Sequence, residues 1–162
     1  MGQPVAAELP QLAPGPVASP AVSEANDPVT ELLAAASTLA VVGCSANPAK
    51  AAHTVPRSLQ QRGYRVIPVH PTAYELLGEP VRRSLADIED PVDIVVVFRP
   101  SAEAGAVVGS AIEAGAPAVW LQQGITSAAG RERAERAGVH YVEDRCMIIE
   151  VKRRDLWAAG HN

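Results

Sequence analysis

Aromatic residues are scarce in this sequence. Two tryptophans, three tyrosines and one phenylalanine stand among 162 residues, whereas hydrophobic residues make up 48% of the chain. A buried core must therefore be built mainly from valine, isoleucine, leucine and alanine. The length suits one domain with a core of its own.

A basic surface and a long apolar segment are also missing. The formal net charge is −4, so no basic field attracts a nucleic-acid backbone. No run approaches the ~20 apolar residues of a membrane span, and the N-terminus lacks the pattern of a signal peptide. The sequence therefore predicts a cytoplasmic protein with neither a nucleic-acid nor a membrane partner. It predicts no particular oligomeric state.

Catalytic and metal-binding motifs are absent as well. Cys44 and Cys146 are the only cysteines, and neither lies in a spacing typical of metal ligands. We interpret both as reduced packing residues. An alternative is that Lys50, His53 and a nearby helix N-terminus lower the pKa of the Cys44 thiol. The sequence has no evident Ser-His-Asp order and no HExxH motif, and no pair of carboxylates stands at the ends of the predicted strands. We therefore predict no catalytic residue and no metal.

The chain divides into a tail, a domain and a short end. Residues 1–26 are rich in proline and alanine without helical or strand period, which predicts a disordered tail. Residues 27–153 alternate between apolar runs and helical patterns, and residues 154–162 are predicted to fray. Asp27 and Pro28 suit the N-cap and first position of an opening helix. Further helices are expected over 53–62, 101–113 and from Thr126 or Ser127 to Gly138.

Five apolar runs, each near-uniform rather than alternating, are predicted to be strands: 38–43, 64–69, 93–98, 117–122 and 139–144. Strands covered on both faces have this composition, and parallel sheets are covered on both faces. Strands separated by helices indicate right-handed crossover units. The predicted fold is therefore α/β, a Rossmann-like doubly wound, mainly parallel five-stranded sheet in a three-layer sandwich.

Ligands of such sheets bind beyond the carboxyl ends of the strands. The loop after the first strand offers Gly43, which allows a phosphate to approach the backbone, and the donors Ser45, Asn47, Lys50 and His53. The N-terminus of the next helix adds free N–H groups and a partial positive charge. This pattern suits an anion cradle, although an ordinary tight loop fits it equally well.

The end of the second predicted strand indicates which kind of nucleotide could bind. A site for NAD has the pattern GxGxxG and an acid at the end of strand two, which binds the ribose hydroxyl. Here the second and third glycines are missing, and His70 and Pro71 occupy the place of the acid. His70 is expected near a further phosphate or the adenine, or alternatively only caps a turn. Arg99 and Gln122 follow the third and fourth strands at the same edge.

The ordered set of segments resembles a known family. The runs "TLAVVGCSANPAKAAHTVPRSLQQRGYRVIPVHP", "VDIVVVFRPSA", "GAPAVWLQQGI" and "AGVHYVEDRCMIIE" are similar to the small stand-alone coenzyme A (CoA)-binding proteins. Those proteins resemble the CoA-binding domain of succinyl-CoA synthetase. The similarity covers roughly residues 29–153. His70 stands where Asn is usual, and Ala52-His53 where a Ser- or Ala-aromatic pair is common.

The resemblance implies that CoA lies across the carboxyl edge of the sheet. By it, the first loop meets the nucleotide phosphates, the end of the second strand lies on the adenine side, and the third and fourth strand ends complete the site. With the loop donor Asn47, the expected CoA-binding residues are Gly43, Ser45, Asn47, Pro48, Lys50, His53, Thr54, Val69, His70, Pro71, Phe98, Arg99 and Gln122. CoA carries a thiol, so a mixed disulfide with Cys146 is a further hypothesis.

Three functions remain open on this basis. The main prediction is a module that binds CoA or acyl-CoA and catalyses nothing. The first alternative is a CoA-binding subunit of an acyl-CoA ligase that works with a separate partner chain. The second alternative is an NAD(P)-dependent oxidoreductase, against which the missing glycines and the missing acid argue.

Overall fold

A computed structural model describes residues 27–161 of the chain. The tail predicted over residues 1–26 lies outside the described residues. Within the described part, no helix has both the length and the apolar character needed to cross a bilayer.

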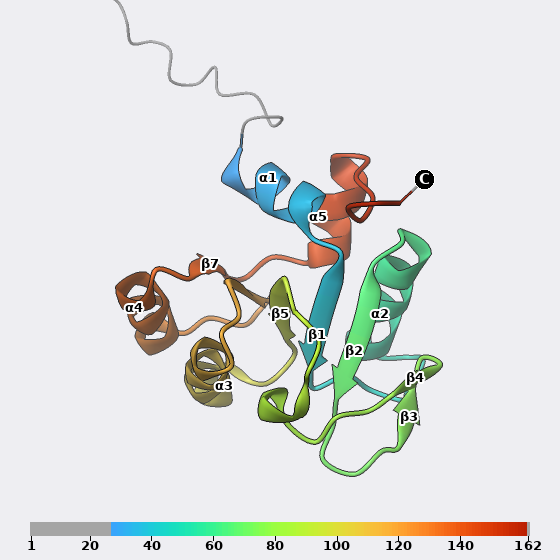
Figure 1. Cartoon of the computed structure of the whole chain (residues 1–162), viewed down its shortest axis with the longest axis horizontal. Coiled ribbons are helices and arrows are strands. Elements are labelled where there is room, and N and C mark those ends of the chain that lie inside the picture. Colours follow the sequence, from blue (N-terminus) through green and yellow to red (C-terminus); the bar gives the residue numbers. More distant parts are fainter. Residues whose placement is uncertain (1–26, 162) are drawn as a thin grey trace, which may run out of the picture.

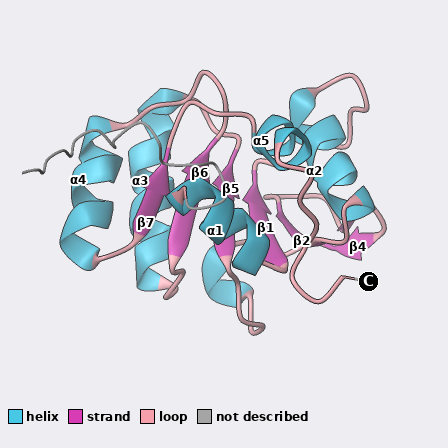
Figure 2. Ribbon diagram, turned by 90° about the horizontal axis from the view of Figure 1, so that it is seen from above, coloured by secondary structure: helices cyan, strands magenta, loops and turns pink. Residues whose placement is uncertain are grey.

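The centre of the molecule is a sheet of five parallel strands. Their order is β2-β1-β5-β6-β7, as Figure 2 shows from one edge to the other. The strands are β1 (Thr38–Val42), β2 (Arg65–Val69), β5 (Ile94–Val97), β6 (Ala118–Leu121) and β7 (His140–Val142). Strand β1 pairs with β2 on one side and β5 on the other, so the chain winds outward from β1 in both directions. The carboxyl ends of β1 and β5 therefore form the switch point where such folds bind ligands.

Helices cover both faces of the sheet and make a three-layer sandwich. One face packs against α1 (Pro28–Ala35), α2 (Ala51–Gln61) and α5 (Met147–Arg153), and the other against α3 (Ser101–Glu113) and α4 (Ala128–Ala137). Figure 1 shows α3 and α4 away from α2 and α5. Aliphatic side chains fill both cores, with the fully buried Trp120 as the large exception. The predicted Rossmann-like α/β fold is confirmed.

Predicted helix starts are correct where a cap defines them. Asp27 accepts a hydrogen bond from the Val29 N–H, and Ser127 accepts one from Gly130, so both cap their helices as expected. Helix α2 begins at Ala51, two residues before the predicted start, and Pro56 consequently lies inside the helix instead of in its first turn.

The connection from β2 to β5 has no α-helix. A two-stranded hairpin, β3 (Glu75–Leu76) and β4 (Glu79–Pro80), is followed by the short 3-10 helix η4 (Leu85–Asp87). The sequence pattern predicts no element here. Leu85 is the buried residue of η4 and packs against the face of the sheet that α3 also covers.

The prediction that residues 154–162 fray is wrong for residues 154–161. The N–H groups of Ala158 and Ala159 donate to the carbonyls of Arg62 and Ala36. The Trp157 ring stacks on His161 at 4.5 Å between centroids, and the Arg62 guanidinium lies over it. These contacts are long-range, so a sequence period could not reveal them.

Arg154 joins both ends of the described chain. Its guanidinium donates to the carboxylates of Asp27 and Glu150, and its side chain is only 3% exposed. The hydrogen bond from Arg154 lowers the pKa of the Asp27 carboxyl, although burial opposes the shift. The pair therefore fixes the start of α1 against the end of α5.

We expect Arg154→Ala to lower the free energy of unfolding by about 2–3 kcal/mol, because two carboxylates lose a buried partner. The control Lys152→Ala, at an exposed position of the same helix, should change little. Since the folded-state pKa of Asp27 is depressed, its stabilisation is complete above about pH 4 and decreases as the pH falls towards the folded value. Urea unfolding of wild type and both variants at neutral and acidic pH measures this. Equal costs for the two variants at neutral pH would contradict the assignment.

Candidate functional site

A groove opens at the switch point of the sheet. Its volume is about 730 Å³, and its walls come from the loop after β1, the end of β2 and the first turns of α3. Seven of the residues proposed from the sequence line it: Gly43, Ser45, Lys50, Val69, His70, Pro71 and Arg99. The structure thus brings three separate sequence segments to one cavity.

Gly43 permits the close approach of β1 and β5 at the floor of this groove. Its φ angle is +89°, a conformation that side chains other than glycine rarely adopt. A Cβ here would lie 3.0 Å from Cδ of Arg99 and 3.1 Å from the carbonyl oxygen of Phe98. Glycine at position 43 therefore allows the ends of β1 and β5 to lie close together, and it leaves the backbone at this position uncovered by a side chain.

Polar residues of the loop after β1 mostly hold the loop itself. The Ser45 hydroxyl accepts from the Asn47 N–H, and the Asn47 side chain accepts from the Ala49 N–H. Nδ1 of His53 lies 2.8 Å from the Ser45 carbonyl, so this ring nitrogen carries a proton and donates. Lys50, the exposed N-cap of α2, is the charged group that the loop brings to the groove.

A proline inside α2 contributes to the same loop. Pro56 has no N–H, so the carbonyl of Ala52, four residues earlier, lacks its usual helical donor. The N–H of Ser45 donates to this Ala52 carbonyl at 3.1 Å. The helix irregularity thereby anchors the loop that follows β1.

At the end of β2, a short loop of residues 70–74 is clamped by two side chains. Nδ1 of His70 accepts from the N–H groups of Thr72 and Ala73 at 3.1 and 2.9 Å. The Arg83 guanidinium donates to the carbonyls of His70, Thr72 and Ala73. Sequence reasoning missed Arg83, because it reaches this loop only through the β3–β4 hairpin.

The third wall carries an ion pair. Arg99 donates to Glu103 in the first turn of α3 at 2.8 Å, and both side chains are about half exposed. Among the described residues that line the groove, Glu103 is the only acid, beside the cations Lys50, Arg83 and Arg99. The groove is therefore suited to an anionic ligand. No group of three or more metal-ligating side chains occurs in residues 27–161.

The remaining predicted residues do not line the groove. Asn47, Pro48 and Thr54 are exposed, and His53 is half-buried behind the loop. Phe98 is half-buried and packs against the core on the face of the sheet that α2 and α5 cover. Gln122 is 4% exposed; its Oε1 accepts from the Met147 N–H, and its Nε2 has no hydrogen-bond partner within the described chain.

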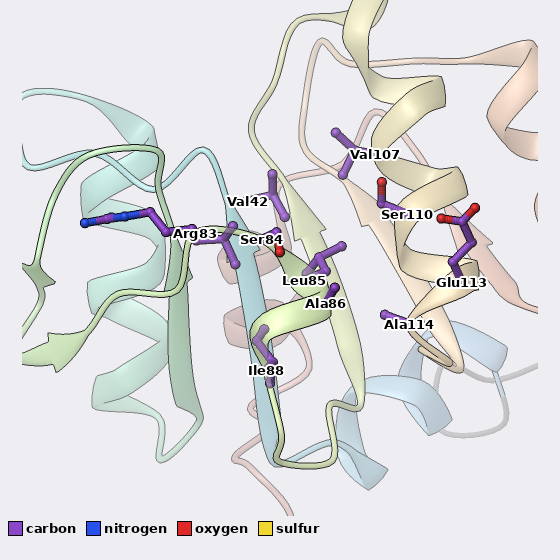
Figure 3. A pocket seen from close by; sticks show the side chains of 11 residues that line it. Val42, Arg83, Ser84, Leu85, Ala86, Ile88, Val107, Ser110, Glu113 and Ala114 are labelled. Atoms are coloured by element: carbon purple, nitrogen blue, oxygen red, sulfur yellow. The ribbon is translucent and has the colours of Figure 1, made fainter.

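A second cavity of about 470 Å³ shares Val42, Val69, Arg83 and Val107 with the groove and extends it. Figure 3 shows Ser84, Leu85 and Ala86 on one wall and Val107 and Ser110 of α3 opposite, with Arg83 reaching away from the cavity. Most of this lining is aliphatic. The groove therefore has a cationic part and a mainly aliphatic extension, which Glu113 of α3 also lines.

The two cysteines differ in their burial and in their surroundings. Cys44 is 2% exposed in the core beside α2, and burial raises the pKa of its thiol to about 11. The expected lowering by Lys50 and His53 is wrong, because desolvation by burial dominates and only a backbone hydrogen bond from Ser45 opposes it. Cys146 is half-buried at the N-cap of α5 and outside the groove lining.

An open groove with a cationic part, at the switch point of a parallel sheet, defines the class of a Rossmann-like binding domain for an anionic ligand. Residues 37–152 match the family described as "CoA binding domain". The chain belongs to this family, and the resemblance inferred from the sequence is confirmed.

Three relatives illustrate the family. The Bacillus subtilis protein YneT, described as uncharacterized, is 36% identical over 121 residues, which cover 75% of this chain and 90% of YneT. The Thermus thermophilus structure "cell-free ID.343" is 40% identical with a TM-score of 0.73, covering 76% of this chain and 93% of that chain. Dinucleotide-forming acetyl-coenzyme A synthetase 1 of Ca. Korarchaeum cryptofilum is 29% identical with a TM-score of 0.61, over 70% of this chain and 27% of the synthetase.

Gly43→Ala should destabilise the fold more than a glycine substitution that only strains the backbone. Gly115, at φ +82°, has nothing within 4 Å of the position that a Cβ would take, so Gly115→Ala should cost about 1–2 kcal/mol. Gly43→Ala should cost about 1–3 kcal/mol more, because its methyl group meets Phe98 and Arg99. Chemical denaturation of both variants measures the difference, and equal costs would argue against the close approach.

The thiols should react at different rates. A disulfide reagent should modify the half-buried Cys146 quickly and the buried Cys44 only after unfolding, because a thiol must be accessible to react. The Cys146→Ser variant should consequently show almost no fast phase, whereas Cys44→Ser should retain it. A fast phase that persists without Cys146 would show that Cys44 is accessible after all.

Proposed function

We propose that this chain binds CoA or an acyl-CoA in the groove at the switch point and catalyses no reaction itself. The observation that carries the proposal is the convergence of Lys50, Arg83 and Arg99 on one groove, with a single lining acid that Arg99 neutralises. A ligand with several phosphates matches this charge, because Arg and Lys donate to phosphate oxygens. Membership of the CoA binding domain family supports the choice of CoA.

The shape of the site supports a long ligand with chemically different parts. The phosphates would lie against the loop that begins at Gly43 and the N-terminus of α2. There the N–H groups of Ala51 and Ala52 have no acceptor within the described chain, whereas that of His53 donates to Lys50. The aliphatic extension between η4 and α3 suits a flat base such as adenine. The expected site residues that line the groove would touch the ligand, whereas His53 and Asn47 would act by shaping the loop.

The absence of paired reactive groups in the described groove supports binding without chemistry. Ser45 is engaged in a turn, and burial keeps the Cys44 thiol protonated. A nucleophile needs an adjacent base to be activated, and no such pair lies among the described lining residues. The proposal includes a cytoplasmic location, where the two free cysteines would remain reduced.

A second candidate is a CoA-binding part of an acyl-CoA synthetase that acts with a separate chain. The observation in its favour is the match to a segment of an acetyl-coenzyme A synthetase, 27% of that enzyme's length. In this case the chain alone would bind CoA, and acyl-CoA would form only after addition of an ATP-using partner. Production of acyl-CoA by the isolated chain would contradict both candidates.

CoA should raise the melting temperature of the protein. At a hundred times its dissociation constant a ligand stabilises the fold by about 2.7 kcal/mol, or roughly 8–10 °C for a domain of this size. NAD⁺ should give no such shift, because residues 70–74 hold no acid for its ribose. A shift with NAD⁺ and none with CoA would favour the oxidoreductase alternative.

The same measurement tests whether CoA binds in the groove or elsewhere on the surface. Lys50→Ala should reduce the shift with CoA, since the variant removes one charge from the lining. Lys152→Ala removes the same charge from an exposed position on α5 and should leave the shift unchanged. An unaltered shift in Lys50→Ala would place CoA outside this groove.

A further inference from the structure

The loop of residues 70–74 determines which nitrogen of His70 carries the proton. Two backbone N–H groups, those of Thr72 and Ala73, point at Nδ1 at 3.1 and 2.9 Å. A backbone N–H can only donate, so Nδ1 must be unprotonated and accept. The ring is therefore held as the neutral tautomer with its proton on Nε2, and that edge is turned away from the loop.

Arg83 lies beside this ring, and its guanidinium can only donate hydrogen bonds. Its guanidinium is held by the carbonyls of His70, Thr72 and Ala73, and both His70 and Arg83 line the groove. The end of β2 thus presents donors: one neutral N–H and one cation. Residues 70–74 contain no acid, and Glu103, on the opposite wall, is already paired with Arg99.

We propose that His70 is a specificity residue that donates its Nε2–H to a phosphate group on the ribose of the ligand, next to the Arg83 guanidinium. In doubly wound folds the end of strand two faces the ribose of a bound nucleotide. In NAD sites the free hydroxyls of the ribose donate to an acid at this place. A phosphate is itself an acceptor and therefore requires donors there. The proposal rests on the proposed function, because CoA carries a phosphate on its ribose.

Two substitutions separate the two nitrogens of His70. In His70→Asn the side-chain oxygen can accept from the N–H groups two and three residues ahead, as Asn does in turns, but the Nε2 donor is lost. In His70→Gln the amide nitrogen reaches the place of Nε2. Wild-type melting temperature in the Asn variant would show that the loop is intact.

The test is calorimetric titration with CoA and with dephospho-CoA, which lacks only the ribose phosphate. Wild type should bind CoA about tenfold to a hundredfold more tightly, which corresponds to a hydrogen bond with a charged group. His70→Asn should lose most of this preference, and His70→Gln should retain part of it. Equal affinities in wild type, or an undiminished preference in a folded His70→Asn, would overturn the proposal and leave CoA binding intact.

Two further measurements separate this proposal from the proposed function. NADP⁺ also carries a ribose phosphate, so a His70-dependent preference for NADP⁺ over NAD⁺, without CoA binding, would keep the role of His70 and refute CoA as the ligand. Nitrogen chemical shifts of His70 in the ligand-free protein should show the proton on Nε2. A proton on Nδ1 would refute the tautomer and with it the proposal, whichever ligand binds.

Discussion

The close approach of two strand ends at Gly43 is the constraint on which the site depends. β1 is the strand from which the sheet extends in both directions, and its end must pass beside the end of β5 before the chain turns into the next loop. The backbone of Phe98 and the stem of Arg99 occupy the space that any side chain at position 43 would need. This contact sets the floor of the groove and carries Arg99 to its wall, while Glu103 fixes the direction of the guanidinium. Packing within the fold and access for a ligand thus require the same glycine.

The regular part of the fold could be predicted because local signals determine it. Uniformly apolar runs predict strands that are covered on both faces, and the buried residues of β1, β5 and β6 agree with this. Asp27 and Ser127 define helix starts through hydrogen bonds within a single turn. The start of α2 was misplaced because Lys50 forms no side-chain cap, so no residue type marks the boundary. The ordered C-terminal end was missed because Arg62, Ala36 and Asp27, which hold it, are more than ninety residues away in sequence.

The candidate site could be predicted by position but not by the role of each side chain. Strand ends of a parallel sheet meet at one edge, which is sufficient to bring Gly43, His70 and Arg99 together. The position of the strand ends does not show that the side chains of Asn47 and His53 form hydrogen bonds within the loop, or that Gln122 lies within the core. Donor type alone suggests phosphate contacts for all three. The hydrogen bond between Ser45 and Ala52 was equally hidden, because it exists only when Pro56 lies deep inside α2.

The irregular crossover between β2 and β5 explains why the groove is long and why it carries Arg83. In a regular crossover a helix packs on the sheet along its whole length. Here η4 covers the α3 face of the sheet with Leu85, whereas Leu76 of the hairpin packs in the core on the opposite face. Val42 and Val69 remain as walls of the cavity beside α3. The same hairpin turns the chain back so that Arg82 pairs with the end of β2 and the next residue, Arg83, reaches the carbonyls of the 70–74 loop. One departure from the repeating pattern therefore both opens space for an apolar group and supplies the cation that stands beside it. Because a loop that is already held in place loses less conformational entropy when a ligand binds, the clamp on residues 70–74 favours affinity for a ligand that contacts it.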